Sequence, residues 1–116
     1  MLPGPRRLKR PSDFGATVRR GSRAATPTVV VHVRRTIDQD PPDFTRVGFV
    51  VSKKVGNAVT RNRVKRRLRH FAGDLDAQFN TDVVVRALPA AALEPQRVRD
   101  DLEDAWARAF ARAAAC

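Results

Sequence analysis

Apolar residues between positions 58 and 73 recur every three or four residues, which is the period of an amphipathic helix. Projected at about 100° per residue, its apolar positions fall within roughly 60° of one another. They are Val64, Leu68, Phe71 and, just beyond, Leu75. This side of the helix is expected to pack on a core, which leaves the other side for solvent or a partner.

Two further helices are predicted towards the ends of the chain. Ser12 is a favourable N-cap and Gly21 a favourable terminator, so a short helix is expected over residues 12–20. A longer one is expected over residues 95–113, packed on a sheet, with charged residues such as Arg108 facing outward. Its apolar positions are Val98, Leu102, Ala105, Trp106, Ala109, Phe110 and Ala113.

Three apolar runs predict strands. Residues 28–36 are rich in β-branched side chains, residues 46–52 alternate in period two, and residues 82–87 form a short buried run. Turn formers at residues 38–43 separate the first two runs, so an antiparallel hairpin is their simplest arrangement. A connection containing Pro and Ala is expected over residues 88–92.

The order of these elements is helix, strands, helix, strand, helix, which predicts an α/β (α+β) sandwich. The length of 116 residues suits one domain. Residues 1–11, interrupted by three prolines, are expected to form a flexible basic arm, and residues 12–116 a single domain.

The net charge of +11 points to a polyanionic partner. Residues 1–73 carry 18 basic and four acidic side chains, whereas residues 74–116 carry five basic and eight acidic ones. Positive charge is therefore concentrated in one part of the chain, which favours phosphate binding over a general effect on solubility.

The densest basic segment runs from Lys53 to Phe71 and contains no acidic residue. Acidic residues would normally be interspersed on a merely solvated helix. Four polar residues centre on the side opposite the apolar stripe: Asn62, Lys65, Arg66 and Arg69. Three arginines lie at the flanks of this polar side: Arg61, Arg63 and Arg67. The planar guanidinium group suits phosphate, so this side is a candidate phosphate-binding surface.

The run from Val47 to Phe71, together with Arg46, closely resembles the signature of the bacterial ribonuclease P protein component, most recognisably in Arg61, Asn62 and Arg63. The segment RRLKRPSDF around Phe14 resembles the opening of the same family. The resemblance implies a four-stranded mixed sheet with three helices in the order αβββαβα. It also implies a left-handed crossover, where general rules favour a right-handed one.

For function, the resemblance implies a protein that binds a catalytic RNA and helps it remove the 5′ leader from precursor tRNA. Mg²⁺ would be held by that RNA, and the protein would have no catalytic residues. The residues implied to contact the catalytic RNA are Lys53, Lys54, Asn57, Arg61, Asn62, Arg63, Lys65, Arg66, Arg67 and Arg69. A cleft implied to hold the leader would use Phe14, Val18 and His32, the last two replacing the aromatic residues usual in the family. From the residues alone, a partly buried position in the sheet is favoured for His32, and with the resemblance the two interpretations are equally supported.

Other chemistry finds less support in the sequence. A cation loop at Asp38, Asp40 and Asp43 lacks EF-hand spacing, so a solvated turn is favoured. His32 and His70 lie on different elements, and there is no zinc spacing, Gly-rich phosphate loop or nucleophile elbow, which disfavours an independent nuclease.

Two binding proteins of other classes remain alternatives. A ribosomal or general RNA-binding protein would fit the charge pattern, although not the long signature. A DNA-binding regulator would need a helix just before residues 58–73, where the sequence predicts a strand and a turn.

The expected cellular location follows from features that the sequence lacks. No apolar run is long enough for a signal peptide or a membrane span, and Cys116 has no partner for a disulfide. A cytoplasmic protein without membrane contact is expected, and no protein partner is predicted.

Overall fold

The structure is a computed structural model that describes residues 11–35, 45–75 and 81–115, with the side chains of residues 11–13 and 45 left aside. The expected basic arm, apart from its last residue, and the turn at residues 38–43 lie outside the described residues, as does Cys116. The elements in chain order are α1 (Pro11–Arg20), β1 (Ser22–Ala25), β2 (Val29–Arg35), β3 (Thr45–Val50), α2 (Ala58–Ala72), β4 (Thr81–Ala87), α3 (Ala90–Leu93), the 3₁₀ turn η2 (Pro95–Arg97) and α4 (Val98–Ala115).

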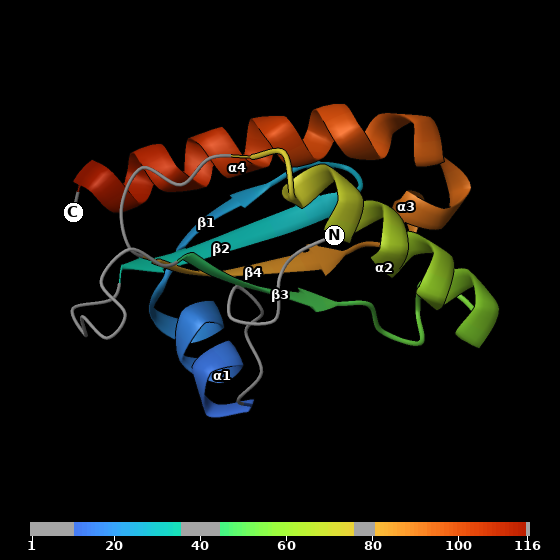
Figure 1. The fold of residues 1–116 in the computed structure, drawn as a ribbon, viewed down its shortest axis with the longest axis horizontal. Coiled ribbons are helices and arrows are strands. Elements are labelled where there is room, and N and C mark those ends of the chain that lie inside the picture. The colour runs from blue at the N-terminus through green and yellow to red at the C-terminus, as the bar shows by residue number, and fades with distance from the viewer. Residues whose placement is uncertain (1–10, 36–44, 76–80, 116) are drawn as a thin grey trace.

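The fold is a four-stranded mixed sheet with helices on both faces, which confirms the expected α+β class (Figure 1). Helix α1 lies on one face, and α2 and α4 lie on the other (Figure 1). The strand order is β1-β2-β4-β3. Strand β4 pairs antiparallel with β2 and parallel with β3.

The predicted hairpin between residues 28–36 and 46–52 is wrong, because β4 lies between these two strands. Alternation of apolar residues fixes which side chains share a face, but it does not select the neighbouring strand. The hairpin that does form joins β1 to β2, and the Thr26 hydroxyl donates to the Val29 carbonyl at 2.8 Å in its turn. The segment SRAA of β1 contains no β-branched residue, so sequence alone gave no reason to expect a strand there.

The parallel pairing of β3 with β4 requires a crossover, and α2 provides it. Helix α2 is therefore the connection from β3 to β4, and its apolar side packs against the core. The left hand of this crossover stays a prediction from the resemblance.

The chain after β4 contains more separate helical segments than the sequence pattern predicted. The expected connection at residues 88–92 contains the start of α3, and the helix expected over residues 95–113 is a 3₁₀ turn followed by α4. Pro95 lacks an amide hydrogen, so it is accommodated at the start of a helical turn and not within a continuous helix.

The core lies between the sheet and the layer formed by α2 and α4. Alternate residues of β2 enter it, namely Val29, Val31 and Val33, as the alternation predicted. From α2 come Val64, Leu68 and Ala72, and from α4 the seven residues predicted for its apolar stripe. The ring centroids of Trp106 and Phe110 lie 5.2 Å apart within this core.

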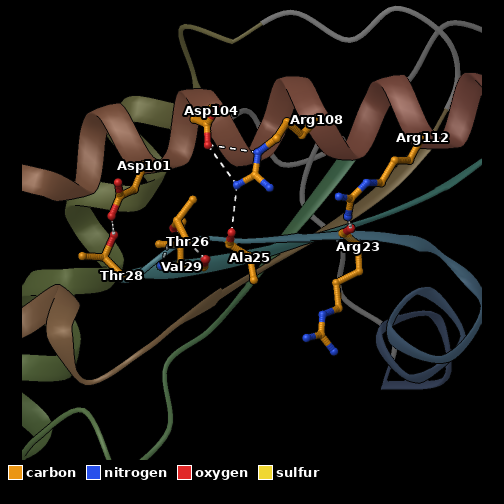
Figure 2. A network of polar contacts seen from close by, with 9 residues as sticks. All are labelled: Arg23, Ala25, Thr26, Thr28, Val29, Asp101, Asp104, Arg108 and Arg112. Atoms are coloured by element: carbon orange, nitrogen blue, oxygen red, sulfur yellow. Dashed lines mark hydrogen bonds and ion pairs between the residues drawn. The ribbon is translucent and has the colours of Figure 1, made fainter.

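Two arginines of α4 reach the outer edge of β1 (Figure 2). Arg108 donates to the carbonyl of Ala25 at 2.8 Å, and Arg112 donates to the carbonyl of Arg23. Arg108, which was expected to face outward, therefore turns back to the sheet. These bonds satisfy two acceptors on an edge strand that would otherwise be open to pairing with another chain.

Candidate nucleic-acid interface

The start of α2 is shaped by two residues of the connection from β3. Gly56 has φ +157°, and a Cβ added there would lie 2.9 Å from Cγ2 of Thr60, so the position requires glycine. Asn57 is the N-cap, and its side-chain oxygen accepts from the Thr60 amide at 2.9 Å. The structure therefore gives Asn57 a capping role, while its exposed side chain remains next to the basic surface.

The predicted division of α2 into an apolar and a basic side is confirmed in position. The apolar side packs into the core, and the basic residues lie on the other side. Among them Asn62, Arg63 and Arg66 are exposed, as are Lys53 and Lys54 before the helix, whereas Arg61, Lys65, Arg67 and Arg69 are half-buried. Within the described part of the chain, none of these cations forms an ion pair with an acidic side chain.

The outer side of α2 contains a hollow of about 360 Å³. The described residues that line it are Asn62, Lys65, Arg66, Arg69 and His70. The first four are the residues that the helical projection placed opposite the apolar stripe. His70 was not predicted as a site residue, although it lies four residues after Arg66 and the same projection places it beside that residue.

Arg61, at the first turn of α2, has a buried Nε atom that forms no hydrogen bond within the described residues. A buried donor without a partner is costly, and a bound phosphate would accept from it only after the Arg61 side chain moved outward. A basic surface that contains no acidic side chain among its described residues is suited to the sugar-phosphate backbone of a nucleic acid.

Of the three residues expected in a leader cleft, Phe14 and Val18 belong to α1, which lies on the opposite face of the sheet (Figure 1). His32 alternates with the core residues Val31 and Val33 along β2, so it lies on the same face as α1. Phe14 and Val18 are half-buried on α1. His32 on β2 is only 2% exposed, and neither ring nitrogen has a hydrogen-bond partner within the described residues. Burial, followed by the positive charges of Arg86 and Arg23, lowers the pKa of His32 to about 4. His32 is thus a neutral, covered residue of the sheet.

The sheet face around His32 also carries charged residues that the sequence interpretation did not select. Asp82 on β4 is fully buried and pairs in register with Arg34 on β2 and Arg46 on β3. Its carboxylate accepts from Arg34 at 2.8 Å and from Arg46 at 2.8 and 2.9 Å. Arg23 and Arg86 are exposed on the same face. The alternation in each strand could have placed these residues off the core face, but only the strand order brings them together.

The protein therefore has two basic surfaces, separated by the sheet. One is the outer side of α2, and the other is the face covered in part by α1. The residues predicted to contact the catalytic RNA lie on α2 or just before it, and Phe14, Val18 and His32 lie on the α1 side of the sheet. What either surface binds stays a prediction.

Comparison with known proteins decides the family. Residues 2–110 match the family model described as Ribonuclease P. The chain belongs to the ribonuclease P protein family. The family assignment and the overall fold inferred from the signature are therefore confirmed.

Curated members of the ribonuclease P family extend over nearly the whole chain. The ribonuclease P protein component of Mycolicibacterium gilvum is 48% identical over 115 residues, covering 97% of this chain and 92% of that protein. That of Streptomyces avermitilis is 48% identical over 118 residues, covering 93% and 94%.

Solved structures of ribonuclease P proteins share the fold. The Staphylococcus aureus protein at 2.0 Å has a TM-score of 0.76 and 30% identity, covering 90% of this chain and 97% of that one. The Thermotoga maritima protein, solved in complex with 1-(4-fluorophenyl)-2-thiourea, has a TM-score of 0.70 and 28% identity, covering 84% and 94%.

Two further observations concern this family member's described residues. None of their helices is long and apolar enough to cross a membrane. They also contain no group of three or more His, Cys, Asp or Glu side chains placed to bind a metal ion.

Proposed function

We propose that this chain is the protein subunit that binds the catalytic RNA of ribonuclease P and the 5′ leader of precursor tRNA. In this role it supports Mg²⁺-dependent removal of the leader, which gives tRNA its mature 5′ end. The observation that carries the proposal is the basic side of α2, a helix without acidic residues, in a member of the ribonuclease P family. No residue of the chain is proposed to be catalytic.

The α2 surface is proposed to bind the catalytic RNA. Arg66 and Arg69 line the hollow beside Lys65, so phosphates there would meet several cations at once. Asn62 adds an uncharged donor and acceptor that could contact sugar or base. Lys53 and Lys54 extend the positive surface beyond the start of the helix.

The α1 face is proposed to bind the single-stranded leader. Phe14 is half-buried, so part of its ring remains available for stacking on a base. Val18 offers apolar contact beside it. His32 is covered in the free protein, which makes its proposed part in leader binding dependent on a local adjustment of α1.

Mg²⁺ is proposed to be held by the RNA. The ion would activate water for phosphodiester hydrolysis, leaving a 5′ phosphate on tRNA. The contribution of this chain is then to neutralise phosphate repulsion between the two RNAs and to hold the leader in place.

The competing function is general RNA binding without a part in tRNA processing. The two functions differ in whether the complex recognises the leader. The chain, assembled with a bacterial ribonuclease P RNA, should bind leader-bearing precursor more tightly than mature tRNA. Equal affinity for the two would favour the general RNA-binding function, and equally tight binding of duplex DNA would favour a DNA-binding one.

A further inference from the structure

The backbone and the side chain of Arg23 face opposite layers of the molecule. Its carbonyl accepts a hydrogen bond from Arg112 on α4, whereas its side chain points away from α4 (Figure 2). The next residue, Ala24, is fully buried in the core on the α4 side, as alternation along a strand requires. Helix α4 thus fixes the edge strand, and the guanidinium of Arg23 is exposed on the α1 face.

Arg23 and Arg86 lie on either side of His32. The register places Arg23 directly opposite His32 on the neighbouring strand. Arg86 lies on the strand beyond, where it pairs with Val30, two residues before His32. Both arginines are exposed, and their positive charges are felt by the buried imidazole between them. Strand spacing and rise put their Cα atoms about 12 Å apart.

Among the described side chains, this part of the face has positive charge without compensation. Within the described residues neither Arg23 nor Arg86 has an ion pair or a side-chain hydrogen bond. Asp82 is the only acidic residue of the described strands, and its carboxylate is already bonded to the two arginines beside it. Helix α1 adds two more cations at its last turn, Arg19 and Arg20. Such a surface repels itself until an anion binds.

We propose that Arg23, acting with Arg86, binds phosphate groups of the single-stranded leader, so that the leader crosses the sheet from α1 to the edge strand β1. This inference rests on the proposed function and extends it to a strand outside the predicted cleft. The guanidinium group bonds phosphate through two directed donors. A separation of about 12 Å corresponds to phosphates two nucleotides apart on an extended single strand, given roughly 6 Å per nucleotide.

The test compares Arg23→Ala with the wild type in the assembled enzyme. The full chain is combined with a bacterial ribonuclease P RNA. Affinities of this complex are measured for mature tRNA and for precursor tRNA with a leader of about eight nucleotides, which is long enough to span the sheet. Arg23→Ala should weaken binding of the precursor about five- to tenfold and leave mature tRNA unaffected. The slope of log affinity against log salt should fall by about 0.7 for the precursor.

Two further variants separate a phosphate contact from a change in fold or in net charge. Arg97→Ala removes the same charge from η2, where the side chain is exposed and 3.6 Å from Glu94, and it should leave both affinities unchanged. Arg23→Lys should restore most of the affinity for the precursor. The bond from Arg112 goes to a backbone carbonyl, so both changes at Arg23 leave it in place.

The inference is overturned if Arg23→Ala matches Arg97→Ala on the precursor, or if it weakens mature tRNA to the same extent. In either case the wild type would still prefer the precursor, and the proposed function would stand. If the wild type shows no preference for the precursor, the proposed function fails, and this inference fails with it.

Discussion

Arg46 on β3 donates two hydrogen bonds to the buried carboxylate of Asp82 on β4, from Nε at 2.8 Å and from Nη2 at 2.9 Å. Arg34, on the other side of β4, donates a third at 2.8 Å. One carboxylate therefore links three adjacent strands, including the parallel pair at the edge of the sheet. Arg46 comes just before the signature segment, and this contact explains why an arginine is suitable there.

Replacing Asp82 with Asn should destabilise the protein by about 2 kcal/mol. The change removes the negative charge between two guanidinium groups, although their partial exposure, 27% and 36%, reduces the cost. Urea unfolding followed by fluorescence of the single tryptophan, Trp106, measures the free energy. The control is Glu103→Gln, which breaks an exposed pair with Arg99 and should cost less than about 0.5 kcal/mol. Equal losses in the free energy of unfolding would show that the buried network stabilises the fold no more than an exposed ion pair does.

Stability should fall as the pH is lowered from about 6.5 to about 4. Burial and two nearby arginines lower the pKa of His32 to about 4 in the folded chain, from 6.5 in the unfolded one. The unfolded chain therefore binds the proton first, and up to about 3 kcal/mol of the free energy of unfolding is lost across this window.

His32→Leu should flatten that pH dependence, because no imidazole remains to be charged on unfolding. His70→Gln, at an exposed position on α2, should leave it unchanged. The free energies of unfolding of the three proteins are compared between pH 7 and pH 4. The carboxylates are the same in all three proteins, so their contribution to the pH dependence cancels in the comparison. The account of His32 would be wrong if His32→Leu kept the slope of the wild type.

Arg66→Ala should weaken binding to ribonuclease P RNA and reduce the salt dependence. The side chain is exposed at the hollow of α2, so it should replace about one counterion on a bound phosphate and lower the slope by about 0.9. Arg97→Ala, which removes one charge from η2, serves as the control. An unchanged slope for Arg66→Ala would exclude the hollow from the RNA interface.

Phe14→Ala should reduce the affinity of the assembled enzyme for precursor tRNA by about 1–3 kcal/mol if the ring stacks on a leader base. Assembly with the catalytic RNA, which is proposed to use the other face of the sheet, should be unaffected. Affinities for the RNA and for the precursor are measured separately. Similar losses in both would indicate a defect in folding and not a lost contact with the leader.

The α2 surface was predictable from the sequence because both of its determinants are local. The helical period places Val64 and Leu68 on one side and Arg66 on the other, whatever the rest of the fold. The sheet was less predictable, because alternation in β2 and β3 fixes their faces and not the insertion of β4 between them.

The charged network on the α1 face could not be predicted for the same reason. Arg34, Arg46 and Asp82 are separated by up to 48 residues, and each looks like an ordinary charged residue near a strand end. Only the strand order makes them neighbours. The edge strand β1 had no pattern of its own, since its stability depends on pairing with β2 and on hydrogen bonds from α4.

The most direct test of the proposed function is multiple-turnover cleavage of precursor tRNA by a bacterial ribonuclease P RNA at low Mg²⁺, with and without this protein. The account predicts that the protein stimulates cleavage at the mature 5′ end and that the protein alone cleaves nothing. Tight binding to the RNA without any stimulation would contradict it.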